Sequence, residues 1–119
     1  MKKLTHSIKY ALQGIAHLFI TQRNARFHLV AASMALALGF WLKISVIEWA
    51  FITLCISAVI GAEAFNTAIE TMCDTLHHEI HPKIKIVKDL SAAAVLIISI
   101  GALVIGSLIF LPKLLDLFL

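Results

Sequence analysis

Three carboxylates and an amide recur at helical spacing in the middle of an otherwise apolar stretch: Glu63, Asn66, Glu70 and Asp74, with Thr67 among them. At about 100° per residue, all five fall within roughly 100° around a helix and form one polar stripe. Carboxylates on one stripe repel each other unless a cation or a basic group compensates. Mg²⁺ is the natural partner, because it prefers carboxylate oxygens and substrate phosphates.

The stripe also covers a range of depth. A rise of about 1.5 Å per residue puts Glu63 roughly 10 Å deeper than Glu70. We expect Glu63 at the edge of the hydrocarbon, within reach of a lipid headgroup, and Glu70 and Asp74 nearer to water, within reach of a nucleotide. Ionisable groups at membrane depth are costly and usually mark function. The alternative is a buried acid paired with Lys88 or an arginine, which would serve assembly only.

The elements that position this stripe must lie in a membrane. Of the 119 residues, 61% are hydrophobic and only 14% are charged, against about 25% charged in average globular chains. Such a composition excludes a soluble globular domain, a disordered tail and a nucleic-acid-binding basic domain. Three apolar runs are long enough to cross a bilayer. We expect spans at about 27–43, at about 46–64 with the helix continuing to 75, and at about 90–112.

A surface helix precedes the spans. Apolar residues at steps of three and four predict an amphipathic helix over about 4–20, lying on the membrane. These residues are Leu4, Ile8, Leu12, Ile15 and Phe19. The expected fold is therefore all-α, with this helix and three transmembrane helices in a single domain, 1–119. Lysines and arginines concentrate before the first span and between the second and third, which predicts a cytoplasmic N-terminus.

Basic residues lie on the same side as the stripe. Lys88 and Asp89 open the third span, and a lysine beside carboxylates can hold phosphates as a point charge. The alternative for Lys88 is a lysine that snorkels to the interface. The histidine-rich loop before it fits no closed zinc site. The chain has no P-loop, no Gly-rich nucleotide loop and no G-x-S-x-G motif, so phosphate chemistry would use another kind of site.

The ordered motifs resemble the small prokaryotic diacylglycerol kinase family, which includes the undecaprenol kinases. The resemblance rests on E-A-F-N-T-A-I-E at 63–70, Asp74, E-I-H-P at 79–82 and K-D-L-S-A-A-A-V at 88–95. Tyr10, Gly14 and R-N-A-R-F-H at 23–28 resemble the family's N-terminal part. The resemblance implies a homotrimeric lipid kinase of the bacterial inner membrane, with ATP as co-substrate, Mg²⁺ as cofactor and active sites between subunits at the cytoplasmic interface.

The resemblance also implies roles for single residues. Glu63 would be the catalytic acid/base and would touch the lipid, which Trp41 and Ser91 would border. Glu70 and Gln22 would hold the metal. The positions expected to bind ATP are Lys3, Tyr10, Gln22, Asn66, Glu70, Asp74, Glu79, His81, Lys88 and Asp89. Gln22 stands where the family usually has a glutamate, and an uncharged ligand predicts weaker Mg²⁺ affinity.

Several alternatives remain at this point. The acceptor could be diacylglycerol or undecaprenol, and R-N-A-R-F-H together with the His-Pro loop favours undecaprenol slightly. A small transporter or proton channel could also use the acidic stripe, although transporters usually show inverted repeats and broken helices. A scaffold subunit would use the stripe for assembly alone.

Overall fold

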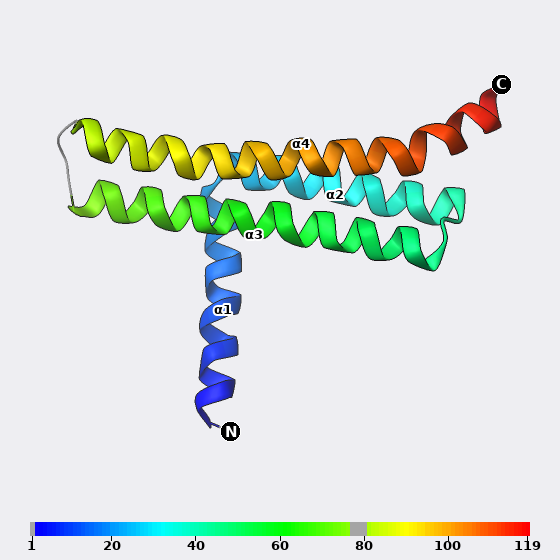
Figure 1. The fold of residues 1–119 in the computed structure, drawn as a ribbon. Helices are drawn as coiled ribbons and strands as arrows, with labels where there is room; N and C mark the ends of the chain where they lie inside the picture. Colours follow the sequence, from blue (N-terminus) through cyan, green and yellow to red (C-terminus); the bar gives the residue numbers. More distant parts are fainter. Residues whose placement is uncertain (1, 77–80) are drawn as a thin grey trace.

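The computed structural model describes residues 2–76 and 81–119. Within these ranges the chain forms four helices and no strand, which confirms the predicted all-α class. Their order is α1 (Lys2–Thr21), α2 (Arg23–Leu42), α3 (Val46–Leu76) and α4 (Pro82–Phe118). Three helices, α2, α3 and α4, lie side by side, and α1 projects from them to one side (Figure 1).

Helix α1 projects from the bundle, and most of its apolar face is exposed in the described chain. Leu4, Ile8 and Leu12 are each more than half exposed, and Leu18 is the buried residue of the helix. An amphipathic helix with its apolar face left open is the form expected for a segment that lies on a lipid surface. This agrees with the predicted surface helix.

A break at Gln22 separates α1 from α2. Gln22 has an extended backbone and gives α2 no side-chain cap. The guanidinium of Arg26 donates to the carbonyl oxygens of Phe19 and Ile20, at 3.1 and 2.8 Å. These carbonyls end α1 without partners in the helix, so Arg26 satisfies them and holds the corner. The helix of the first span therefore begins at Arg23, four residues before the predicted span.

The turn between α2 and α3 contains a reciprocal cap. Lys43 adopts a left-handed backbone conformation with φ of 52°. The backbone N–H of Ser45 donates to Oε1 of Glu48 at 2.9 Å, and the N–H of Glu48 donates to Oγ of Ser45 at 3.2 Å. This S-x-x-E capping box sets the start of α3. Glu48 also pairs with Lys113 of α4 at 3.3 Å, which ties the two helices together at this end.

Helices α3 and α4 are longer than a membrane requires. With 31 and 37 residues they measure about 46 and 55 Å, against a hydrocarbon core of about 30 Å. Helix α4 begins well before the predicted span and passes through Pro112, so the proline does not end it. The C-terminal part of α4 leans away from α2 and α3 (Figure 1), and proline is a common cause of such bends.

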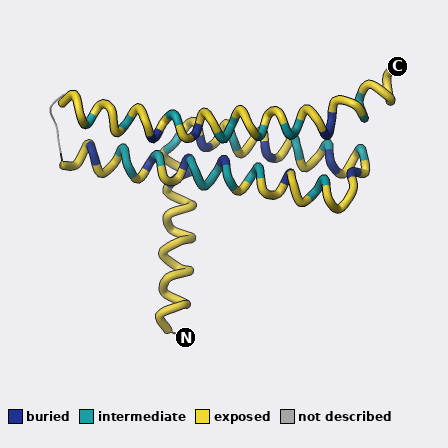
Figure 2. Tube along the Cα trace, in the orientation of Figure 1, coloured by how far each residue is buried: buried dark blue, intermediate teal, exposed yellow. Residues whose placement is uncertain are grey.

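Three helices are long and apolar enough to cross a membrane: α2, α3 and α4. Most of their surface is exposed, and buried positions are scattered along the faces where the helices meet (Figure 2). A small core of Ile44, Ile52, Ile109 and Phe110 lies near the α2–α3 turn. Exposed leucines and isoleucines on the outer faces fit contact with lipid or with further copies of the chain. The chain is therefore a multi-pass membrane protein.

Candidate active site at the ends of α3 and α4

The polar stripe of α3 lies at the end of the bundle opposite the α2–α3 turn, and it faces three different neighbours. Asn66 and Asp74 face α4, Glu63 faces α2, and Thr67 lies in a cleft beside α1. Glu70 lies between these positions and is half-buried. A stripe that is continuous on the isolated helix is therefore divided among three partners by the tertiary structure.

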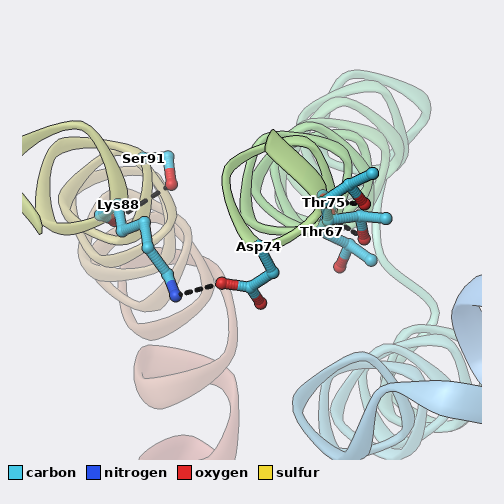
Figure 3. Close-up of polar contacts among 6 residues, drawn as sticks. Thr67, Asp74, Thr75, Lys88 and Ser91 are labelled. Carbon is cyan, nitrogen blue, oxygen red and sulfur yellow. Dashed lines mark hydrogen bonds and ion pairs between the residues drawn. The ribbon is translucent and has the colours of Figure 1, made fainter. Parts of the chain in front are cut away.

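Besides the Glu48–Lys113 pair near the α2–α3 turn, two polar contacts between described residues join α3 to α4 at this end of the bundle. The ammonium Nζ of Lys88 lies 2.7 Å from Oδ1 of Asp74 (Figure 3). Oγ of Ser91 donates to Oδ1 of Asn66 at 2.7 Å. Lys88 precedes the apolar run that begins at Leu90, so it lies outside the spanning segment. The carboxylate of Asp74 accepts a hydrogen bond from Lys88, and this bond raises the pKa of the lysine.

The Lys88–Asp74 pair is accessible from solvent. The lysine side chain is 36% exposed and the aspartate side chain 66%. Exposed ion pairs are weak because water competes for both partners. The ammonium of Lys88 is therefore open to exchange with another anion, and its role as a point charge for phosphates stays a prediction.

Glu63 is the most buried acidic or basic residue in the described structure, with 3% of the residue exposed. Its Oε1 lies 3.3 Å from Nε2 of His28 on α2. His28 ends the R-N-A-R-F-H segment at 23–28, and the sequence alone predicted no role for this histidine. His28 is an ionisable residue at the second position of the apolar run that begins at Phe27. This placement could have pointed to a functional contact, because such a residue needs a polar partner at its own depth in the membrane.

A cleft of about 670 Å³ separates α1 from α3. Its wall on α1 consists of Gly14, His17 and Leu18, and the wall on α3 includes a row of three threonines, Thr67, Thr71 and Thr75. Figure 3 shows Thr67 and Thr75 on the side of α3 that points away from Lys88. Oγ1 of Thr67 is buried without a hydrogen-bond partner among the described residues.

The remaining predicted residues are spread over the chain. Lys3 and Tyr10 are exposed on α1, before the residues that line the cleft. Asp89 is exposed and pairs with Lys85 at 2.6 Å. His81 caps α4, where its Nδ1 accepts from the backbone N–H of Lys83 at 3.1 Å. Glu79 lies outside the described residues.

Trp41 and Ser91 differ in their relation to Glu63. Ser91 is buried and contacts Asn66, one turn of α3 from Glu63. Trp41 is exposed near the other end of α2, 13 residues beyond His28 and therefore about 20 Å along the helix. One chain thus places Ser91 near the acid and Trp41 far from it.

A bound Mg²⁺ is compatible with the donors present. Glu70 is a half-buried carboxylate that has no hydrogen bond or ion pair with another described residue. Gln22, at the corner between α1 and α2, donates through Nε2 to Oγ1 of Thr21 at 3.2 Å, so its carbonyl oxygen is available. The described residues contain no cluster of three His, Cys, Asp or Glu side chains that could hold a metal. Mg²⁺ needs none, because it commonly uses one or two carboxylates with water and phosphates.

These features define a class: an all-α, multi-pass membrane protein with an ionisable site at one end of its bundle. Comparison with known proteins gives the family. The sequence profile of prokaryotic diacylglycerol kinase matches residues 9–110. The chain belongs to the prokaryotic diacylglycerol kinase family, and the expectation of a lipid kinase is confirmed at that level. The family favours this activity over the transporter and scaffold alternatives.

Relatives with assigned names support the same family. An undecaprenol kinase of Bacillus subtilis is 40% identical over 114 residues, which cover 96% of this chain and 93% of the relative. A diacylglycerol kinase of Synechocystis is 36% identical over 93% of this chain, but the match covers only 64% of that longer protein. A diacylglycerol kinase of Escherichia coli K12 is 30% identical over 80% of this chain and 78% of its own length.

Proposed function

We propose that this chain transfers the γ-phosphoryl group of ATP, in a Mg²⁺-dependent reaction, to the primary hydroxyl of a membrane lipid. The observation that carries the proposal is the burial of Glu63, one to three turns from Asn66, Glu70 and Asp74 on the same apolar helix. Such an arrangement suits a reaction between a lipid and a nucleotide, because it offers a base at lipid depth and polar ligands closer to water.

The proposed step moves one proton and exchanges one bond. The lipid oxygen attacks the γ-phosphorus, the bond from that phosphorus to the β–γ bridging oxygen breaks, and ADP leaves. The carboxylate of Glu63 accepts the hydroxyl proton as the new P–O bond forms. Phosphoryl transfer depends mainly on positioning and charge neutralisation, and little covalent help is needed from the protein.

The nucleotide would lie along the ends of α3 and α4. Glu70 and Gln22 would hold Mg²⁺, which would offset charge on the phosphates. Lys88 would bind a phosphate after exchange with Asp74, and Asn66 would be oriented by Ser91. The further nucleotide residues are expected to be Lys3, Tyr10, Asp74, Glu79, His81 and Asp89.

We propose undecaprenol as the preferred acceptor and diacylglycerol as the second. The relative named undecaprenol kinase supports this order, because it is 40% identical and matches over nearly its whole length. The Arg23–His28 segment and the His-Pro loop favour the same branch. The groups that surround the hydroxyl differ between the two lipids, whereas the chemistry at the primary hydroxyl is the same.

We further propose a homotrimer in the bacterial inner membrane, with a cytoplasmic N-terminus. Lys3 and Tyr10 are exposed on α1, whose N-terminal part projects away from the other three helices (Figure 1). A site that uses them together with Asp74 and Lys88 would therefore draw on a neighbouring copy. The lysines and arginines near α1 and at the start of α4 support the orientation. Mass measurement of the protein in detergent would test the trimer.

The activity test is transfer of ³²P from γ-labelled MgATP to lipid by the purified protein in mixed micelles. Diacylglycerol and undecaprenol are offered separately, with and without Mg²⁺. Labelled lipid is expected with wild type, and Glu63→Gln is expected to lower the rate by at least about 100-fold with assembly intact. Retained turnover in this variant would remove Glu63 from its role, and no label with either lipid would contradict the proposed acceptors.

A further inference from the structure

Within the described part of the chain, the side chain of Glu63 has a polar contact with His28. Nε2 of the histidine lies 3.3 Å from Oε1 of the glutamate, and the side chains are 20% and 4% exposed. A carboxylate that is removed from water to this extent is costly without a polar partner. The contact therefore does more than fill space between α2 and α3.

Three other cations of the described chain that lie near the ends of these helices have partners of their own. Arg26 donates to backbone carbonyls at the end of α1. Lys88 pairs with Asp74, and Lys85 pairs with Asp89. His28 is the basic side chain of α2 that contacts Glu63 in the described structure, and its removal would take this contact from the buried carboxyl group.

The ring of His28 also lines an apolar groove of about 550 Å³ between α2, α3 and α4. Ala31 and Ala32, one turn further along α2, line the same groove, and so does Val59 of α3. Glu63 is not part of the groove wall. The ring therefore contacts the carboxyl group and also borders the apolar space, so its position constrains how the carboxyl group can turn.

We propose that His28 is a positioning residue for Glu63. The imidazole holds Oε1, so the carboxylate presents its other oxygen to the substrate hydroxyl. The inference rests on the proposed function, because it assumes that Glu63 is the base. Loss of His28 would let the carboxylate rotate away from the attacking geometry, and an error of about 1 Å in such geometry can lower a rate 100-fold.

Two substitutions, His28→Gln and His28→Asn, distinguish a role in positioning Glu63 from a role in packing. In His28→Gln the amide nitrogen reaches about as far as Nε2 and can donate to Oε1. In His28→Asn it reaches only about as far as Nδ1. The two replacements are similar in chemistry, so the difference between them reports on the contact with Glu63.

The experiment measures kcat and KM for lipid phosphorylation in the mixed-micelle assay. We expect His28→Ala and His28→Asn to lower kcat by about 10- to 100-fold. The KM for MgATP should stay within about twofold, since an interaction that acts only in the transition state changes kcat alone. We expect His28→Gln to retain most of the activity. Ser33→Ala, at an exposed position of α2, is the control and should match wild type.

Several results would overturn the proposal. Wild-type kcat in His28→Ala would do so, as would equal losses in the Gln and Asn variants or a change confined to the KM for MgATP. If His28→Ala does not fold in detergent, the kcat of His28→Gln compared with that of His28→Asn tests the proposal. A wild-type protein that labels no lipid would refute the proposed function. An active wild type with an inactive Glu63→Gln and an unimpaired His28→Ala would refute the role of His28 alone.

Discussion

Ser91 and Asn66 are 25 residues apart in sequence and joined by one hydrogen bond between α4 and α3. Oγ of Ser91 lies 2.7 Å from Oδ1 of Asn66 and 3.0 Å from the backbone carbonyl oxygen of Lys88. This hydroxyl therefore links the two helices and orients an amide that is expected to face the nucleotide. The bond therefore joins Ser91, which is expected to border the lipid, to Asn66, which is expected to bind ATP.

Replacing Ser91 with alanine should loosen this junction. The Ser91→Ala variant leaves Oδ1 of Asn66 without its donor, which should cost about 1–2 kcal/mol of stability and raise the KM for MgATP. Thermal unfolding in detergent and steady-state kinetics would measure both. Ser57→Ala is the control, because Ser57 is exposed and its hydroxyl donates to Thr53 within α3. Equal effects in the two variants would contradict the prediction.

Removing the charge of Lys88 should weaken nucleotide binding. Lys88→Met keeps much of the side-chain length but leaves no ammonium for a phosphate, and it also leaves Asp74 without its partner. We expect the KM for MgATP to rise by about tenfold or more, as loss of a charged hydrogen bond would produce. Lys83→Met is the matched control at an exposed position of the same helix. An unchanged KM in Lys88→Met would place the lysine outside the nucleotide site.

Restoring a carboxylate at position 22 should tighten metal binding. Gln22→Glu would replace the proposed neutral oxygen ligand with a charged one, at a corner where the side chain bonds to Thr21 among the described residues. A titration of activity against free Mg²⁺ at saturating ATP should show half-maximal rate at a lower concentration than in wild type. Gln13→Glu, on exposed α1, controls for the added negative charge. An unchanged Mg²⁺ requirement would argue against Gln22 as a ligand.

The glycines of α2 and α4 should respond differently to alanine. A Cβ at Gly39 would lie 2.6 Å from Cη2 of Trp49, whose ring packs on Phe40 with 4.8 Å between centroids. A Cβ at Gly101 would meet no atom within 4 Å. Gly39→Ala should therefore lower the thermal stability. Gly101→Ala should leave it unchanged or raise it slightly, because alanine favours a helix over glycine by about 1 kcal/mol. Equal shifts would contradict this.

Much of the fold could be predicted from the chain because the lipid environment imposes simple rules. Backbone groups in hydrocarbon must bond within their own helix, so long apolar runs specify spanning helices. The steps of three and four residues between Leu4 and Phe19 predicted an amphipathic helix, because they match the period of an α-helix. The residues at which helices begin and end were harder to predict, because contacts between helices help to set them. Arg26 lets α2 begin at Arg23 by satisfying the end of α1, and α4 passes Pro112.

The candidate site divides in the same way. The spacing of Glu63, Asn66, Glu70 and Asp74 determines that they share a stripe, because helical geometry relates residues within one element. It says nothing of which neighbour each side chain meets. Packing between helices assigns His28 to Glu63, Ser91 to Asn66 and Lys88 to Asp74. These partners come from other helices, at sequence separations that no local periodicity encodes, so only the tertiary structure could decide them.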